Sequence, residues 1–188
     1  MALDIIEQLR GVSAAHREAA ERIFVELVDR HDETLIETLA VLLKDERPNI
    51  RAAALDIMTE SGDIGDHPWE QNVKALALLS DGDPRVRESA LKLARQTAEA
   101  TSHPSILENL IHCIADSSSK NRDAAIDILL NELGGELDSD HYFLLGEYLS
   151  HRRKVTRDAA REILSAKGQD DLIITLDASV MDADANYT

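Results

Sequence analysis

Aromatic residues and cysteine are both scarce in this chain. Phe, Trp and Tyr together make up 3% of its 188 residues, whereas β-sandwiches favour aromatic and β-branched side chains in their strands. Alanine and leucine are plentiful, which favours closely packed helices. The single cysteine, Cys113, excludes an intrachain disulfide framework and a zinc cage built from cysteines. The composition therefore predicts an all-α protein, and the cysteine content fits a reducing compartment.

Long hydrophobic runs are also missing. No stretch approaches the roughly 20 apolar residues that a membrane span needs. The first residues, Met1 to Glu7, carry acidic charge where a secretory signal peptide would carry basic charge. An apolar content of 44% is nevertheless enough to bury a core. We therefore expect a soluble, cytoplasmic protein that has no membrane partner.

Basic residues are outnumbered by acidic ones. The chain has 36 acidic and 20 basic residues, which gives a formal net charge of −16. Charge of this sign repels nucleic acid and anionic membranes, so the sequence predicts no nucleic-acid partner. Ordinary solubility and adaptation to a salty cytoplasm are two further explanations of the acidity, and the sequence does not separate them from a binding role.

An internal repeat runs through the chain. The pattern Arg, any residue, Ala or Ser, Ala begins at five arginines spaced by 34, 36, 35 and 35 residues, namely Arg17, Arg51, Arg87, Arg122 and Arg157. An aliphatic residue stands six positions after each arginine, and another stands eight positions before it. Within each unit the apolar residues follow helical spacing, which predicts two helices per repeat. Repeats of this kind stack into a solenoid.

The helical spacing predicts ten helices and a short cap. First helices are expected near 2–10, 33–44, 67–80, 104–116 and 139–150, and second helices near 13–30, 48–61, 84–100, 119–132 and 153–166. A last amphipathic segment, from Gln169 to Leu176, is expected to cap the stack. We therefore expect one solenoid domain over residues 1–176 and an acidic, disordered tail over residues 177–188.

The units resemble HEAT repeats over about residues 2–167. The resemblance rests on an aspartate six residues before the arginine, a proline three residues before it, and the Arg-x-x-Ala segment. Two units match in full and the fourth keeps all but the proline, so the matching residues are Asp45, Pro48, Arg51, Asp81, Pro84, Arg87, Asp116 and Arg122. Ser119 replaces the proline of the fourth unit, and Gly11 and His151 replace the aspartates of the first and fifth units.

The resemblance implies a fold and a role for these polar residues. The fold is an α-α superhelix of about five HEAT-type helical hairpins. In HEAT repeats the aspartate and the arginine form a polar ladder between neighbouring units, which implies that role for Asp45, Arg51, Asp81, Arg87, Asp116 and Arg122. The departures in the first and fifth units are expected where one neighbouring repeat is absent.

The resemblance also implies that the second helices line a concave face, the usual binding surface of a solenoid. The residues one and five positions after each arginine point away from the buried stripe. Seven of these ten residues are acidic: Glu18, Asp56, Glu88, Asp123, Asp127, Asp158 and Glu162. This arrangement predicts a groove for a basic protein segment, steered by complementary charge. The alternative is the solvated face of an acidic protein.

The fifth unit has the opposite charge. Between residues 151 and 167, six basic and two acidic residues give a charge of +4. The candidate second docking patch consists of Arg152, Arg153, Lys154 and Arg157. This patch could bind an acidic protein, a phosphate or a second copy of the chain. The alternative is a solvated turn between two helices.

Catalytic signatures are missing from the sequence. The HEAT-like deoxyhypusine hydroxylases bind iron through His-Glu dipeptides, and this chain has none. The alkylpurine glycosylases of similar architecture hold DNA on a basic concave face, whereas this face is acidic. No Gly-rich phosphate loop, serine elbow or zinc helix is present. We therefore expect no catalytic residue, metal or cofactor.

The function predicted from the sequence is that of a protein-binding scaffold or adaptor. Two alternatives stay open. One is a structural module that self-associates, with the basic fifth unit against an acidic unit of another copy. The other is an enzyme similar to the bilin lyases, which also use helical repeats and for which the sequence offers no discriminating motif.

Overall fold

The computed structural model describes residues 33–61, 68–97, 101–133 and 136–176. Within them every regular element is helical, and four helical hairpins follow one another along the chain. The hairpins are α3 (Glu33–Leu42) with α4 (Pro48–Ser61), α5 (Pro68–Leu76) with α6 (Pro84–Gln96), α8 (Pro104–Cys113) with α9 (Ser119–Asp127), and α10 (Ser139–Glu147) with α11 (Lys154–Ala166). The predicted all-α solenoid is confirmed. The helices expected in the first unit and the expected tail lie outside the described residues.

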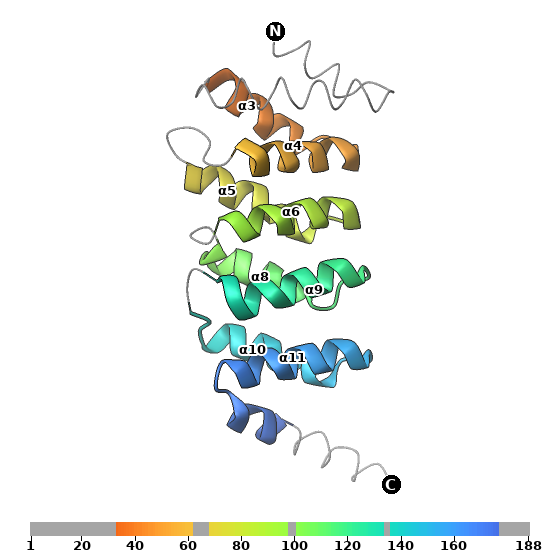
Figure 1. Ribbon diagram of the computed structural model, residues 1–188, viewed down its shortest axis with the longest axis vertical. Coiled ribbons are helices and arrows are strands. Elements are labelled where there is room, and N and C mark those ends of the chain that lie inside the picture. Colours follow the sequence, from red (N-terminus) through yellow and green to blue (C-terminus); the bar gives the residue numbers. More distant parts are fainter. Residues whose placement is uncertain (1–32, 62–67, 98–100, 134–135, 177–188) are drawn as a thin grey trace.

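The hairpins lie one above another, so the first helices form one layer and the second helices form another (Figure 1). In the second-helix layer, α4 contacts α6 and α6 contacts α9. In the first-helix layer, α8 contacts α10 and the turn Ala77–Ser80, which ends the first helix of the preceding unit. Neighbouring units are therefore joined through both layers, as a solenoid requires.

Several helices change their winding near the end instead of continuing as α-helix. A 3-10 turn over Ala77–Ser80 completes the first helix of the third unit, and another over Tyr148–Ser150 completes that of the fifth. The second helix of the fourth unit continues as a π-helical turn over Ile128–Glu132. The second helix of the third unit ends at Gln96, not at residue 100 as expected, because the backbone leaves the helical conformation at Thr97.

Within the described residues, no helix has the length and apolar character needed to cross a membrane.

The turns inside the hairpins carry the residues that start the second helices. Asp83 caps α6, since its carboxylate accepts a hydrogen bond of 2.9 Å from the N–H of Arg85, and Pro84 takes the first helical position. Ser118 caps α9 by accepting the N–H of Asn121 at 3.4 Å, in the unit that lacks the proline. In these two units the local sequence of the turn therefore fixes where the second helix begins.

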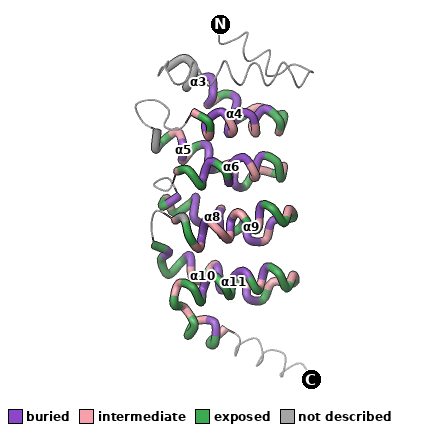
Figure 2. The backbone as a smooth tube through the Cα atoms, in the orientation of Figure 1, coloured by how far each residue is buried: buried purple, intermediate pink, exposed green. Residues whose placement is uncertain are grey.

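One apolar core runs through all four hairpins (Figure 2). The aliphatic residues six positions after the repeat arginines are at most 1% exposed, and in the described units they are Ile57, Leu93, Ile128 and Ile163. Cys113 belongs to the same core, as expected, and burial raises the pKa of its thiol to about 12. The thiol is therefore protonated at neutral pH and is not an activated nucleophile.

The segment after α11 covers the C-terminal end of this core. Residues 170–176 are helical, Ile173 is 6% exposed, and Leu172 and Leu176 pack against the core, as the amphipathic pattern predicted. Gly146 of α10 makes room for this cap, because a Cβ at that position would lie 2.7 Å from Cδ1 of Leu176. The end of the solenoid is thus closed by apolar contact.

The cap gives a test of the fold by two neighbouring substitutions. Ile173→Ala is expected to lower the free energy of unfolding by about 2 kcal/mol, because it removes a buried side chain. Ile174→Ala changes the same side chain at a position that is 66% exposed, and a change below about 0.5 kcal/mol is expected there. Urea unfolding followed by circular dichroism measures both. Equal losses would show that residues 170–176 do not cap the core.

Candidate functional site

Arginine and aspartate pairs join neighbouring units beside the turn of each hairpin. Arg51 donates to both carboxylate oxygens of Asp81, from Nε at 2.7 Å and from Nη2 at 2.8 Å. Arg87 binds Asp116 in the same way, at 2.6 and 2.8 Å. The side chains of Asp81 and Asp116 are only 7% and 1% exposed. The polar ladder implied by the resemblance is therefore present from the second unit to the fourth.

Each of the four repeat arginines that the structure describes also closes the turn of its own hairpin. Its Nη1 donates, over 2.6–2.8 Å, to the backbone carbonyl six positions earlier, in the pairs Arg51 and Asp45, Arg87 and Asp81, Arg122 and Asp116, and Arg157 and His151. The carboxylates of Asp81 and Asp116 each accept, at 2.8 Å, the N–H two residues further on. One arginine thus fixes both the turn of its unit and the position of the next unit. The role of Asp45 toward the first unit lies outside the described residues.

The ladder keeps its carboxylates ionised. Burial alone would raise the pKa of Asp116, but hydrogen bonds from Arg87, from a backbone N–H and from Asn121 outweigh it and lower this pKa to about 2. Burial likewise opposes the ionisation of Asp81, and the hydrogen bonds from Arg51 and from a backbone N–H still lower the pKa of that carboxyl. Both pairs are therefore charged at neutral pH, as a bidentate ion pair requires.

The ladder stops between the fourth and fifth units, which corrects the role expected for Arg122. This arginine closes its own turn, but it has no aspartate across the interface because His151 stands at that position. Within the described ranges Arg122 hydrogen-bonds only to backbone carbonyls and makes no ion pair. Arg153 of the fifth unit reaches back instead, and its Nη1 donates to the carbonyls of Ala115 and Asp116 at 3.2 and 3.1 Å.

Asn121 is a connecting residue that the sequence pattern did not single out. It is 1% exposed and stands where the two preceding units have Ile50 and Val86. Its Nδ2 donates to the carbonyl of Pro84 at 2.9 Å and to Oδ2 of Asp116 at 3.3 Å. Asn121 therefore ties the third and fourth units together beside the ladder. The signal in the sequence was a polar residue at a position that is aliphatic in the two preceding units.

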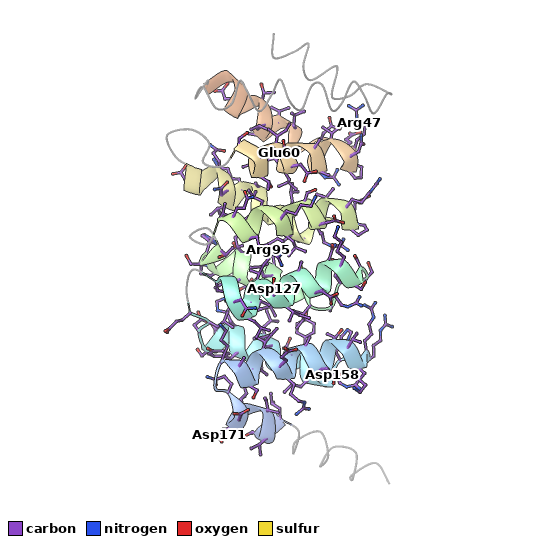
Figure 3. All side chains as sticks on the ribbon, viewed as in Figure 1. Arg47, Glu60, Arg95, Asp127, Asp158 and Asp171 are labelled. Carbon is purple, nitrogen blue, oxygen red and sulfur yellow. The ribbon has the colours of Figure 1, made fainter. Side chains whose placement is uncertain are left out.

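Six of the seven predicted groove carboxylates lie within the described residues, whereas Glu18 does not. They project from α4, α6, α9 and α11, whose order along the stack is clear in Figure 3, where Asp127 and Asp158 are labelled. All six are at least partly exposed. We define the second-helix face as these carboxylates and the cations that pair with them: Asp56, Glu88, Asp123, Asp127, Asp158, Glu162, Lys92, Arg95, Lys120 and Lys154.

The second-helix face is a row of ion pairs more than a uniformly acidic surface. Three pairs link neighbouring second helices and one lies within α11: Arg95 and Asp127 at 2.5 Å, Lys120 and Glu88 at 2.7 Å, Lys92 and Asp56 at 3.5 Å, and Lys154 and Asp158 at 2.8 Å. Asp123 and Glu162 are exposed and have no ion-pair partner in the described part of the chain. Partial neutralisation was not foreseen from the sequence, because it depends on which helices are neighbours.

The predicted basic patch is divided between two places. Lys154 pairs with Asp158 and belongs to the second-helix face. Arg152, Arg153 and Arg157 stay in or beside the turn of the fifth unit, and Arg157 donates to the carbonyls of His151 and Arg152 at 2.8 and 3.1 Å.

Among the residues that the structure describes, no three His, Cys, Asp or Glu side chains are placed to hold a metal ion.

The ladder predicts the cost of removing one of its carboxylates. Asp116→Asn is expected to lower the free energy of unfolding by about 3 kcal/mol, because it leaves the shielded guanidinium of Arg87 without its counter-charge. Asp123→Asn removes the same charge from an exposed, unpaired position, where a change below about 0.5 kcal/mol is expected. Chemical unfolding of both variants at neutral pH provides the comparison. A small effect of Asp116→Asn would contradict the structural role of the ladder.

The ladder also predicts how stability depends on pH. The pKa of Asp116 is about 2 in the folded protein and 3.8 without the fold. The stability that this carboxylate contributes is therefore complete above about pH 4 and is lost as the pH falls through about 2, because the unfolded chain takes up the proton first. Unfolding measured between pH 5 and pH 2 should become easier more steeply for the wild type than for Asp116→Asn. Parallel curves would disprove the link to Asp116.

Comparisons with known proteins agree with this architecture. A family model described as a HEAT repeat associated with sister chromatid cohesion matches residues 101–129. No curated protein matches the chain. A crystal structure of an engineered protein is similar at a TM-score of 0.57 and 14% identity, covering 94% of this chain and 85% of that one. A second engineered protein has a TM-score of 0.54 and 18% identity, covering 91% and 86%.

A third similar structure is a designed armadillo repeat protein in complex with the peptide (KR)4. Its TM-score is 0.51 at 14% identity, and the match covers 87% of this chain and 80% of that one. At these identities the similarity concerns the fold. Together with the stacked hairpins and the arginine–aspartate ladder, it leads to one conclusion: the fold of the chain is a HEAT-like α-solenoid.

Proposed function

We propose that this solenoid is a cytoplasmic, non-catalytic scaffold or adaptor whose second-helix face binds a basic protein segment. The observation that carries the proposal is the recurrence of carboxylates at equivalent positions of successive second helices, as in Glu88, Asp123 and Asp158. Packed helices lie roughly 8–10 Å apart. An extended chain advances about 3.3 Å per residue. A partner with a cation at about every third residue would therefore meet one carboxylate per unit.

The ion pairs of the face do not oppose such a partner. Lys92 and Asp56 are 51% and 41% exposed, and Lys154 and Asp158 are 78% and 57% exposed. Exposed pairs contribute only about 0–1 kcal/mol each. An arginine of the partner can replace a lysine at little cost, because its planar group binds a carboxylate through two hydrogen bonds. Asp123 and Glu162 need no such exchange.

The comparison structures support the same chemistry. The designed armadillo repeat protein of similar fold is in complex with (KR)4, a peptide made only of cationic residues. An acidic face on a repeat protein would recognise a partner of that kind through complementary charge. Binding other proteins along a continuous repeated surface is also the general use of a solenoid.

Charge reversal on the face tests the proposal. The double variant Asp123→Lys with Glu162→Lys changes two exposed carboxylates that have no ion-pair partner among the described residues, so the fold is expected to be retained. Its affinity for a fluorescent (Lys-Arg)4 peptide, measured by anisotropy at low salt, is expected to fall at least about tenfold, since two attractive charges become repulsive. Binding to the wild type is expected to weaken as salt rises.

The matched control makes the same charge change on the other layer. Glu108→Lys with Glu147→Lys alters two exposed carboxylates of the first helices α8 and α10. Its affinity for the peptide should stay within about twofold of the wild type, because these positions belong to the first-helix layer and not to the second-helix face. An equal loss in both double variants would mean that only net charge matters, and the proposed face would be rejected.

A further inference from the structure

Arg122 holds its guanidinium in the same way as the two ladder arginines. Its Nη1 donates to the carbonyls six and five residues earlier, at 2.8 and 3.2 Å, as Nη1 of Arg51 does at 2.8 and 3.0 Å. The Nε and Nη2 edge of Arg51 and of Arg87 then binds a carboxylate of the next unit. The same edge of Arg122 has no acceptor among the described residues.

His151 keeps the turn of the fifth unit but supplies no carboxylate. Its Nδ1 accepts the N–H of Arg153 at 3.2 Å, which is the bond that Asp81 and Asp116 accept in their own turns. With Nδ1 in this contact, the imidazole offers no anionic oxygen to Arg122. The interface between the fourth and fifth units therefore has the geometry of the ladder without its negative charge.

Further guanidinium groups lie at the same interface. Arg153 crosses it, and its Nη1 shares the carbonyl of Asp116 with Nη1 of Arg122. Arg152 is exposed in the adjoining turn. In the described part of the chain none of these three arginines has a carboxylate partner, whereas Arg51 and Arg87 both do. Positive charge thus gathers where the ladder is interrupted.

We propose that this interface, formed by Arg122, Arg152 and Arg153, binds a carboxylate side chain of an acidic protein segment. The bound carboxylate pairs with the edge of Arg122 that corresponds to the edge through which Arg51 and Arg87 bind Asp81 and Asp116. It accepts two hydrogen bonds from Nε and Nη2 of Arg122, and Arg152 and Arg153 add positive charge around it. This site is separate from the second-helix face and does not depend on the function proposed for that face.

The geometry of the site favours a carboxylate over a phosphate. An arginine held by the same turn contacts already binds a planar carboxylate in two preceding units, so the arrangement suits that group.

The test follows the Nε–H signal of Arg122 by NMR, with the signals of Arg51 and Arg87 as internal controls. The probe is the peptide acetyl-(Asp-Glu)4-amide. The Arg122 signal is expected to shift and saturate as peptide is added, whereas the signals of Arg51 and Arg87, which are already paired, should not move. Absence of a saturable shift at Arg122 in the wild type overturns the proposal.

Two substitutions at one position separate the site from general charge effects. His151→Asp restores the ladder aspartate, so the Arg122 signal should move toward those of Arg51 and Arg87 without peptide and then respond at least fivefold less to it. His151→Asn keeps the turn acceptor without the charge, and its response should stay within twofold of the wild type. A full response in His151→Asp overturns the proposal. Inorganic phosphate is titrated at equal ionic strength, and its saturation at lower concentration than the peptide overturns the assignment to a carboxylate.

Discussion

The bidentate pair between an arginine of one unit and an aspartate of the next is the interaction on which the rest of this structure depends. The same guanidinium binds carbonyls of its own turn, so it cannot rotate freely. A planar guanidinium held in this way binds a planar carboxylate in one orientation only. Arg51 with Asp81 and Arg87 with Asp116 therefore set how each unit sits on the one before it, and the second helices fall into register as a consequence.

Burial separates two uses of the same charged groups. The ladder aspartates are almost completely shielded and receive several hydrogen bonds, so losing one partner strands a desolvated charge. The pairs of the second-helix face, such as Lys92 with Asp56, are about half exposed and contribute little to stability. The first kind of pair builds the solenoid, whereas the second kind is exchanged for contacts with another protein in the function that we propose.

The fifth unit changes how the stack is held together. His151 ends the ladder. The last ladder interface of the described units is therefore the one between the third and fourth units, where Arg87 and Asn121 bind Asp116. Beyond it, the end of the core is closed by Leu172, Ile173 and Leu176 of the following segment. An apolar cap needs no matching charge in a further unit. Arg122, in contrast, keeps the Nε and Nη2 edge of its guanidinium without a carboxylate partner among the described residues. The same interruption therefore ends the ladder and creates the carboxylate site proposed for Arg122.

The sequence by itself determined the repeat, the pair of helices in each unit, the burial of Cys113 and the cap that includes Ile173. These features are local or recur every 34–36 residues, so one chain displays them several times. Only the tertiary structure decided that Arg95 and Lys120 neutralise Asp127 and Glu88 and that Asn121 joins two units. Those outcomes depend on contacts between side chains about 30 or more residues apart, whose meeting is set by the stacking of whole hairpins and not by the spacing within one.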